Sequence, residues 1–128
     1  MVNAGSDSME GLGPWRLRRP PATEDLLQIR WMADGPAPRL VFRGELDLDG
    51  VGVAGLALSE AAAAAGRRPL TLDLRQLEFC DSSGLHLLLM TTRRARTDGR
   101  RLAIVPGEAV VRLMRLTGTE SEFEIAEG

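Results

Sequence analysis

The chain of 128 residues is 44% hydrophobic and 27% charged, with a formal net charge of −2 at pH 7. This composition is typical of one globular domain with its own core, and the near-neutral balance gives no general attraction to nucleic acid or to an anionic membrane. All 16 basic residues are arginine. The absence of lysine excludes a Walker-A phosphate loop, a Schiff-base lysine and a kinase-type ATP lysine, so a partner would have to bind any ATP used with this protein.

The chain is also poor in residues that bind metals or form disulfides, with Cys80 as its one cysteine and His86 as its one histidine. An intramolecular disulfide is impossible, and a Cys/His zinc site would lack ligands, so no cofactor is expected. Residues 1–15 lack the pattern of a signal peptide, and the apolar stretch at residues 85–90 is too short to span a bilayer. We therefore expect a cytoplasmic protein.

The first half of the chain predicts a tail, a hairpin and a helix. Residues 1–23, rich in Gly, Ser, Pro and Arg, predict a flexible tail before one domain at residues 24–128. Apolar residues from 26 to 31 and from 40 to 47, around a turn at 35–38, predict two antiparallel strands. Residues 53–65 favour a helix with Gly66 as its left-handed cap, although three glycines weaken its start: Gly50, Gly52 and Gly55.

The middle of the chain predicts a strand and a helix joined by a short turn. Residues 70–74 alternate strictly between apolar and polar, as a strand does, and Phe79 and Cys80 continue its path into the turn. Helix-capping residues follow at positions 81–83, and an apolar stripe then leads to arginines at 93, 94 and 96. Cations at a helix C-terminus complement the helix dipole, which explains this arginine cluster better than a nucleic-acid surface does.

The last third predicts one more strand, a helix and a final strand. Residues 102–105 form an apolar run typical of a central strand, and Pro106 is expected to open a helix that Gly118 closes. Its apolar residues are Val110, Leu113, Met114 and Leu116. Phe123 and Ile125 alternate with glutamates in an expected half-buried strand. The order β-β-α-β-α-β-α-β predicts an α/β fold with a mixed sheet and helices packed on it.

The most informative segment is residues 72–85, where a strand, a tight turn and a helix start follow one another. A helix N-terminus offers unpaired N–H groups and a partial positive charge, which favour a phosphate. A serine there can cap the helix or carry a phosphoryl group, and capping is common. Phosphorylation adds about −1.5 to −2 charges, which beside Asp81 would repel a docked apolar or acidic partner.

Three motifs in order resemble the STAS-domain family, and more narrowly the bacterial anti-sigma-factor antagonists. They are Arg-Gly-Glu-Leu-Asp at 43–47, Leu-Asp-Leu at 72–74 and Phe-Cys-Asp-Ser-Ser-Gly-Leu at 79–85. The resemblance extends over residues 26–125 and includes the late helix at 109–118. It implies a single STAS-like domain.

The resemblance also implies a function. Antagonists of this family bind an anti-sigma factor that is also a serine kinase, and binding releases the sigma factor in stress or sporulation programmes. The kinase phosphorylates the first serine of the Asp-Ser-Ser-Gly motif, here Ser82, which weakens binding until a metal-dependent serine phosphatase resets it. This chain would then be a ligand and substrate rather than an enzyme.

The motif suggests a role for each candidate site residue. Ser82 would accept the phosphate, and Asp81 would shape the loop and its recognition by the kinase. Ser83 would provide the second hydroxyl or cap the helix. Gly84 would let the backbone of the partner approach closely, or it would only relieve crowding at the helix start. Asp47 would contact the partner or cap the following helix.

The chain also departs from the family pattern. It ends at Gly128, where family members usually continue with a final helix, and its start is longer than theirs. Glycines interrupt the first helix, and His86 stands where a small residue is common. Cys80 occupies an apolar family position and is expected to be buried and unreactive. None of these changes touches residues 81–84, so they affect the identity of the partner rather than the switch.

Two other interpretations remain. Residues 80–84 are close to the hydrolase motif G-x-S-x-G but lack its first glycine. The only histidine lies one helical turn along and lacks an orienting acid, which disfavours a hydrolase. The serious alternative is a STAS scaffold or accessory interaction module that is never phosphorylated. The sequence does not determine the oligomeric state.

Overall fold

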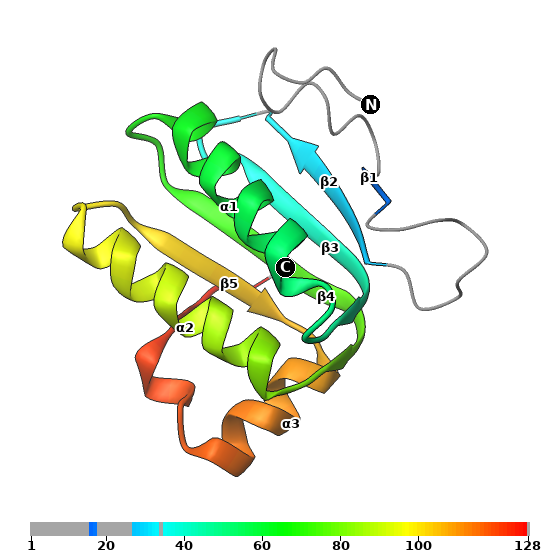
Figure 1. Ribbon diagram of the computed structural model, residues 1–128. Coiled ribbons are helices and arrows are strands. Elements are labelled where there is room, and N and C mark those ends of the chain that lie inside the picture. The colour runs from blue at the N-terminus through cyan, green and yellow to red at the C-terminus, as the bar shows by residue number, and fades with distance from the viewer. Residues whose placement is uncertain (1–15, 18–26, 34, 128) are drawn as a thin grey trace.

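A computed structural model describes residues 16–17, 27–33 and 35–127. The elements, drawn in Figure 1, are β1 (Arg16–Leu17), β2 (Gln28–Met32), β3 (Arg39–Leu46), α1 (Val51–Ala65), β4 (Leu70–Cys80), α2 (Ser82–Thr97), β5 (Leu102–Pro106), α3 (Glu108–Thr117), the 3₁₀ helix η2 (Glu120–Glu122) and β6 (Glu124–Ile125). The six strands form one sheet in chain order.

The sheet is mixed, as predicted. β1 pairs antiparallel with β2, and β2 antiparallel with β3, whereas the pairs β3–β4, β4–β5 and β5–β6 are parallel. The predicted hairpin and the predicted order of elements are therefore confirmed. The strand β1 lies within residues 1–23, where no strand was expected, and the other residues of that predicted tail lie outside the described part of the chain.

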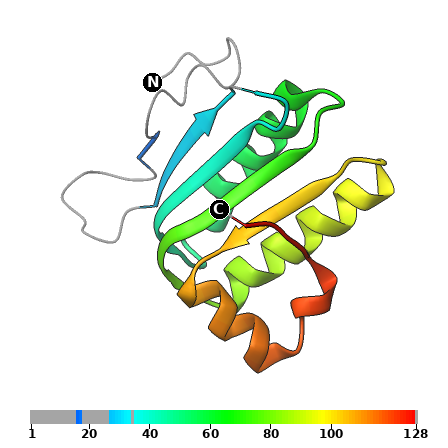
Figure 2. The ribbon, with the colours of Figure 1, turned by 180° about the vertical axis from the view of Figure 1, so that it is seen from behind.

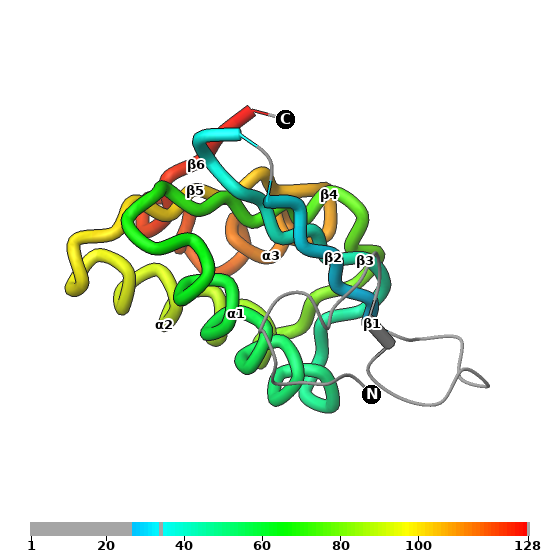
Figure 3. The backbone as a smooth tube through the Cα atoms, turned by 90° about the horizontal axis from the view of Figure 1, so that it is seen from above, coloured from blue at the N-terminus to red at the C-terminus, as the bar shows by residue number. Residues whose placement is uncertain are grey.

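The helices lie mainly on one side of the sheet. Figure 3 shows α1 and α2 side by side below the sheet, and the view from behind in Figure 2 shows the strands in front of both helices. α3 follows the carboxyl end of β5 and contacts β4, β5 and α2. The parallel strands β3 and β4 end at the same edge, where α2 begins directly and α1 begins after a short turn.

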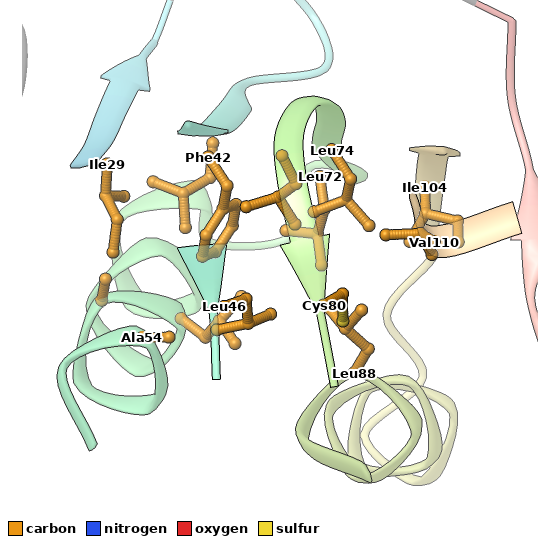
Figure 4. Packing of buried hydrophobic residues seen from close by; sticks show 14 of the residues in the cluster. Ile29, Phe42, Leu46, Ala54, Leu72, Leu74, Cys80, Leu88, Ile104 and Val110 are labelled. Carbon is orange, nitrogen blue, oxygen red and sulfur yellow. The ribbon is translucent and has the colours of Figure 1, made fainter. Parts of the chain in front are cut away.

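The core lies between the sheet and the pair α1 and α2. Leu72 pairs in register with Leu40 on one side and with Ile104 on the other, so large apolar side chains form a row across three strands. Figure 4 shows this layer, with Ala54 of α1 beneath the sheet near Leu46. Full burial of one such side chain contributes about 1.5–3 kcal/mol.

β4 is longer than predicted because two irregularities break its alternation. The expected strand at 70–74 continues to Cys80, and its register against β3 shifts twice. After Leu74 the buried positions are Leu77 and Cys80, three residues apart rather than two. At each register shift β4 has one more residue than β3, as in a β-bulge. The buried side chains stay on one face, but the sequence no longer alternates regularly between apolar and polar residues.

The first helix also differs from its prediction at both ends. α1 begins at Val51 and continues through the glycines that were expected to interrupt it. Gly66 has a positive φ of 64° as expected, but its ψ of −122° is not left-handed helical. The N–H of Arg68 donates to the carbonyl of Ala65 over 3.1 Å, so Gly66 is the first central residue of a type II′ turn.

The end of β5 and the start of α3 require one correction. Pro106 does not open the helix, because it is the last residue of β5 and pairs with Leu74. The helix begins after Gly107, whose extended backbone forms the N-cap. At the other end Gly118 is left-handed, with φ 69° and ψ 30°, and this predicted cap is confirmed.

The apolar residues of the late elements are only partly buried. Leu116, one of the apolar residues of α3, is 77% exposed. The final strand β6 has two residues and pairs parallel to β5. Phe123 is buried just before it, whereas Ile125 is half exposed at the sheet edge. The predicted half-buried strand is therefore shorter than expected.

Candidate protein-interaction site

The start of α2 is set by Asp81, which is its N-cap residue. The Asp81 backbone is extended, and its Oδ1 accepts a hydrogen bond from the N–H of Gly84 at 3.0 Å. The Asp81 N–H donates to the carbonyl of Leu46 at 3.2 Å, which ties the end of β4 to the end of β3. A capping side chain contributes about 1 kcal/mol, so Asp81 fixes where the helix begins.

Ser82 and Ser83 are the first two residues of α2, and neither is its cap. Ser82 is exposed and Ser83 is half-buried. Within the described part of the chain, neither hydroxyl makes a hydrogen bond. The capping role considered for Ser83 therefore belongs to Asp81, and the hydroxyl of Ser82 faces solvent.

Gly84 is buried where α2 packs on the sheet. A Cβ atom at this position would lie 2.7 Å from the carbonyl oxygen of Leu46 and 2.9 Å from Sγ of Cys80. Glycine therefore relieves crowding inside the chain, which is the second of the two roles considered for it. The first role, direct approach of a partner backbone, is not available to a buried residue.

Cys80 is buried beside this contact, as expected from its apolar family position. Burial, followed by the negative charge of Asp81, raises the pKa of the Cys80 thiol to about 12. Because the thiolate is the reactive form, this thiol is unreactive at neutral pH. Figure 4 shows Cys80 next to Leu88 of α2, so the side chain acts as a small apolar core residue.

Asp47 lies at the same edge of the sheet, directly after β3. Leu46 and Cys80 are register partners, so Asp47 and Asp81 each follow one of two paired strand residues. Oδ1 of Asp47 accepts a hydrogen bond from the N–H of Gly50 at 3.2 Å. The N-cap of α1 is Gly50, so Asp47 closes the turn before the helix rather than capping it.

A groove of about 550 Å³ lies between the starts of α1 and α2. Its lining residues are Leu48, Val51, Gly52, Ser82, Ser83, His86, Leu87 and Met90. Leu48 and Met90 are large apolar side chains left 69% and 44% exposed. The structure thus places both serines in the lining of an apolar groove. Asp47, Asp81 and Gly84 do not line it; they shape the turn before α1 and the start of α2.

Most of the groove residues were not identified from the sequence as site residues. On α2 a helical period was available as a signal, because His86 and Met90 follow Ser82 at intervals of four. Leu48 and Val51 belong to the turn and helix after Asp47, and only the fold brings these segments beside α2. From the sequence, His86 is a departure from the family pattern and the one possible histidine base, but not a predicted site residue.

The described residues carry no constellation for metal or membrane chemistry. Among them, no group of three His, Cys, Asp or Glu side chains could hold a metal ion. None of their helices is long and apolar enough to cross a bilayer. The lining of the groove combines an exposed hydroxyl, one imidazole and apolar surface, a composition suited to docking another protein.

Comparisons with known proteins agree with this architecture. The family model described as "Mlab, STAS domain" matches residues 29–124. An anti-sigma factor antagonist from Mycobacterium paratuberculosis has 23% identity and a TM-score of 0.69, covering 83% of this chain and 90% of its own. No curated protein sequence matches the chain.

Two structures of SpoIIAA, a Bacillus cell fate determinant, share the fold at 22% identity. The unphosphorylated anti-sigma factor antagonist has a TM-score of 0.60, covering 78% of this chain and 87% of its own. The phosphorylated form has a TM-score of 0.57, covering 78% and 90%. The family model spans more than half of the sequence, from β2 to β6, and the solved structures share its fold. This chain therefore belongs to the STAS-domain family.

Proposed function

We propose that this protein is an anti-sigma-factor antagonist that docks its partner at the groove beside Ser82. The observation that carries the proposal is the exposed Ser82 hydroxyl at the first residue of α2, set into an apolar groove. Support comes from the shared fold with anti-sigma factor antagonists. The partner is an anti-sigma factor with serine-kinase activity, and its binding releases the sigma factor in the cytoplasm.

Phosphorylation of Ser82 is the proposed switch. The partner supplies the ATP and transfers a phosphoryl group to Oγ of Ser82, and a serine phosphatase removes it. The phosphate brings about −1.5 to −2 charges into a groove lined by Leu48, Leu87 and Met90. Docking would bury that charge against apolar surface, which is strongly unfavourable, so the modified protein leaves its partner. The fold itself need not change.

In this proposal the chain is a regulatory ligand and not an enzyme. Ser82 and His86 lie on one helix, and no hydrogen bond joins them in the described part of the chain. A hydrolase would need the base to reach the nucleophile and an acid to orient that base. No direct contact with nucleic acid or membrane is required for the proposed role.

The switch is tested with two variants of Ser82 and the anti-sigma factor that the unmodified protein captures from its own cytosol. Ser82→Ala should bind as tightly as the parent and stay bound when ATP is added, because it cannot be phosphorylated. Ser82→Asp should bind at least tenfold more weakly, since a charge lies where the contact forms. Titration calorimetry measures both affinities, and mass spectrometry locates the phosphate.

Two further variants separate charge at the groove from charge elsewhere. Met90→Glu places a carboxylate on the groove without touching Ser82 and should weaken binding. Ser121→Asp adds the same charge at an exposed residue of η2, outside the groove, and should leave binding unchanged. Equal affinity of Ser82→Asp and the parent would contradict the proposed mechanism.

A STAS module that is never phosphorylated is the second candidate. It is favoured by the family model, whose description names the STAS domain without an anti-sigma factor. In that case the same groove would bind a partner that lacks kinase activity. Absence of a phosphate-sized mass increase on Ser82 after incubation with the captured partner and ATP would favour the module.

A further inference from the structure

His86 is a groove residue without a role in the proposed docking. It is exposed on α2 and lies four residues after Ser82, which places the two side chains on the same face of the helix. Helical side chains generally lean towards the N-terminus, which is the direction in which Ser82 lies from His86. Both residues line the same groove.

A phosphate on Ser82 would find few other positive groups. The described residues that line the groove include neither arginine nor lysine. The bordering segments instead carry carboxylates, namely Asp47 and Asp49 in the turn before α1, Glu78 near the end of β4, and Asp81 at the N-cap. β5 and α3 also contact α2 but contribute no residue to the groove.

The nearest carboxylate is already engaged. Oδ1 of Asp81 accepts the N–H of Gly84, so one donor of the helix N-terminus is occupied by the cap. The helix dipole still favours a phosphate at the first residue. Among the described residues that line the groove, a protonated imidazole one turn away is the group that can donate a hydrogen bond and a charge together.

We propose that His86 is the positioning residue that holds the phosphate of phosphorylated Ser82 against α2. The proposal rests on the proposed modification of Ser82 and deepens it. The imidazolium donates to a phosphate oxygen and offsets part of the added charge.

The test uses the full chain with phosphoserine incorporated genetically at position 82, so no kinase is needed. Because His86 is the only histidine, its imidazole resonances identify it without assignment. Proton NMR should place the midpoint of the imidazole titration about one pH unit higher in the phosphorylated chain than in the unmodified one. Phosphorus NMR should place the phosphate titration at higher pH in His86→Gln than in the parent, by a similar amount, since coupling is reciprocal.

A matched control carries phosphoserine in place of Ser121, in η2. It adds the same charge outside the groove and should move the imidazole midpoint much less. Equal shifts from both positions, or a phosphate titration that His86→Gln leaves unchanged, would overturn the pairing. A captured partner that fails to phosphorylate Ser82 would refute the switch but leave this measurement interpretable, so the two failures are distinguishable.

Discussion

At the start of α2 the exposure of the chain falls within three residues, from exposed Ser82 through half-buried Ser83 to buried Gly84. Successive helix residues turn by about 100°, so neighbours in the sequence face different surroundings. Ser82 faces the groove, whereas Gly84 faces the carbonyl of Leu46. The hydroxyl is available to a partner because the next residues anchor the helix to the sheet.

Gly84→Ala should destabilise the protein by about 1–3 kcal/mol, because the added methyl group meets backbone at a distance that real Cβ atoms do not tolerate. Urea denaturation followed by circular dichroism measures the loss. The substitution would otherwise favour the helix by up to about 1 kcal/mol, so an unchanged or raised stability would contradict the close packing described for Gly84.

Among the elements, α1 shows how small residues bring a helix close to a sheet. Ala54, Ala57 and Ala61 are buried on its inner face. Their short side chains permit a close approach, and the helix borders the groove only through Val51 and Gly52 at its start. Gly55 lies within the same helix, yet a Cβ there would meet only the Cδ1 of Leu87 at an ordinary 3.8 Å.

Gly55→Ala should therefore stabilise the protein by about 0.5–1 kcal/mol, since alanine loses less backbone entropy in a helix than glycine. It is the matched partner of Gly84→Ala, because the chemical change is the same and only the space around the Cβ differs. Thermal unfolding of both variants gives the comparison. A stability lower than that of the parent would show that α1 and α2 lie closer together than described.

Across the whole molecule, an ion cluster around the buried Asp73, on the other face of the sheet, links β3 to β4. Asp73 lies between the core residues Leu72 and Leu74, so its carboxylate points away from the helices. It pairs with Arg39 at 2.9 Å and Arg75 at 2.6 Å. Burial opposes the charged form, but hydrogen bonds and charge from Arg75, then Arg39, hold the pKa of Asp73 below 3.8.

Asp73→Asn should lower the free energy of unfolding by about 1–2 kcal/mol at neutral pH, an amount reduced by the exposure of both arginines to solvent. A lowered folded-state pKa stabilises the protein above the unfolded-state value and loses that effect as pH falls through the folded-state value. The difference between parent and variant should thus be constant near neutrality and shrink in acid below about pH 4. Urea denaturation across this pH range measures the stability difference. If Asp73 acted only through packing and not through its charge, the difference would not shrink in acid.

Local chemistry in the sequence determined most of the elements and where the proposed switch residue lies. Apolar runs around a turn cluster placed the hairpin, helix propensity placed α1, and apolar residues at helical spacing placed α2 and α3. Asp81 and Ser82 marked the start of α2 because capping depends only on near neighbours. The Phe-Cys-Asp-Ser-Ser-Gly-Leu motif at 79–85 likewise lies within one short segment. Such features could be predicted since each is encoded by residues that are adjacent in the chain.

Other features depended on contacts between distant segments. The bulges of β4 were hidden because they break the alternation that identifies a strand, and the role of Gly84 required the position of Leu46. The groove combines the turn after β3 with one face of α2, so Leu48 and Met90 became neighbours only on folding. Tertiary structure decided these features because parallel strands bring residues about 35 positions apart to one edge of the sheet, and no local pattern records that meeting.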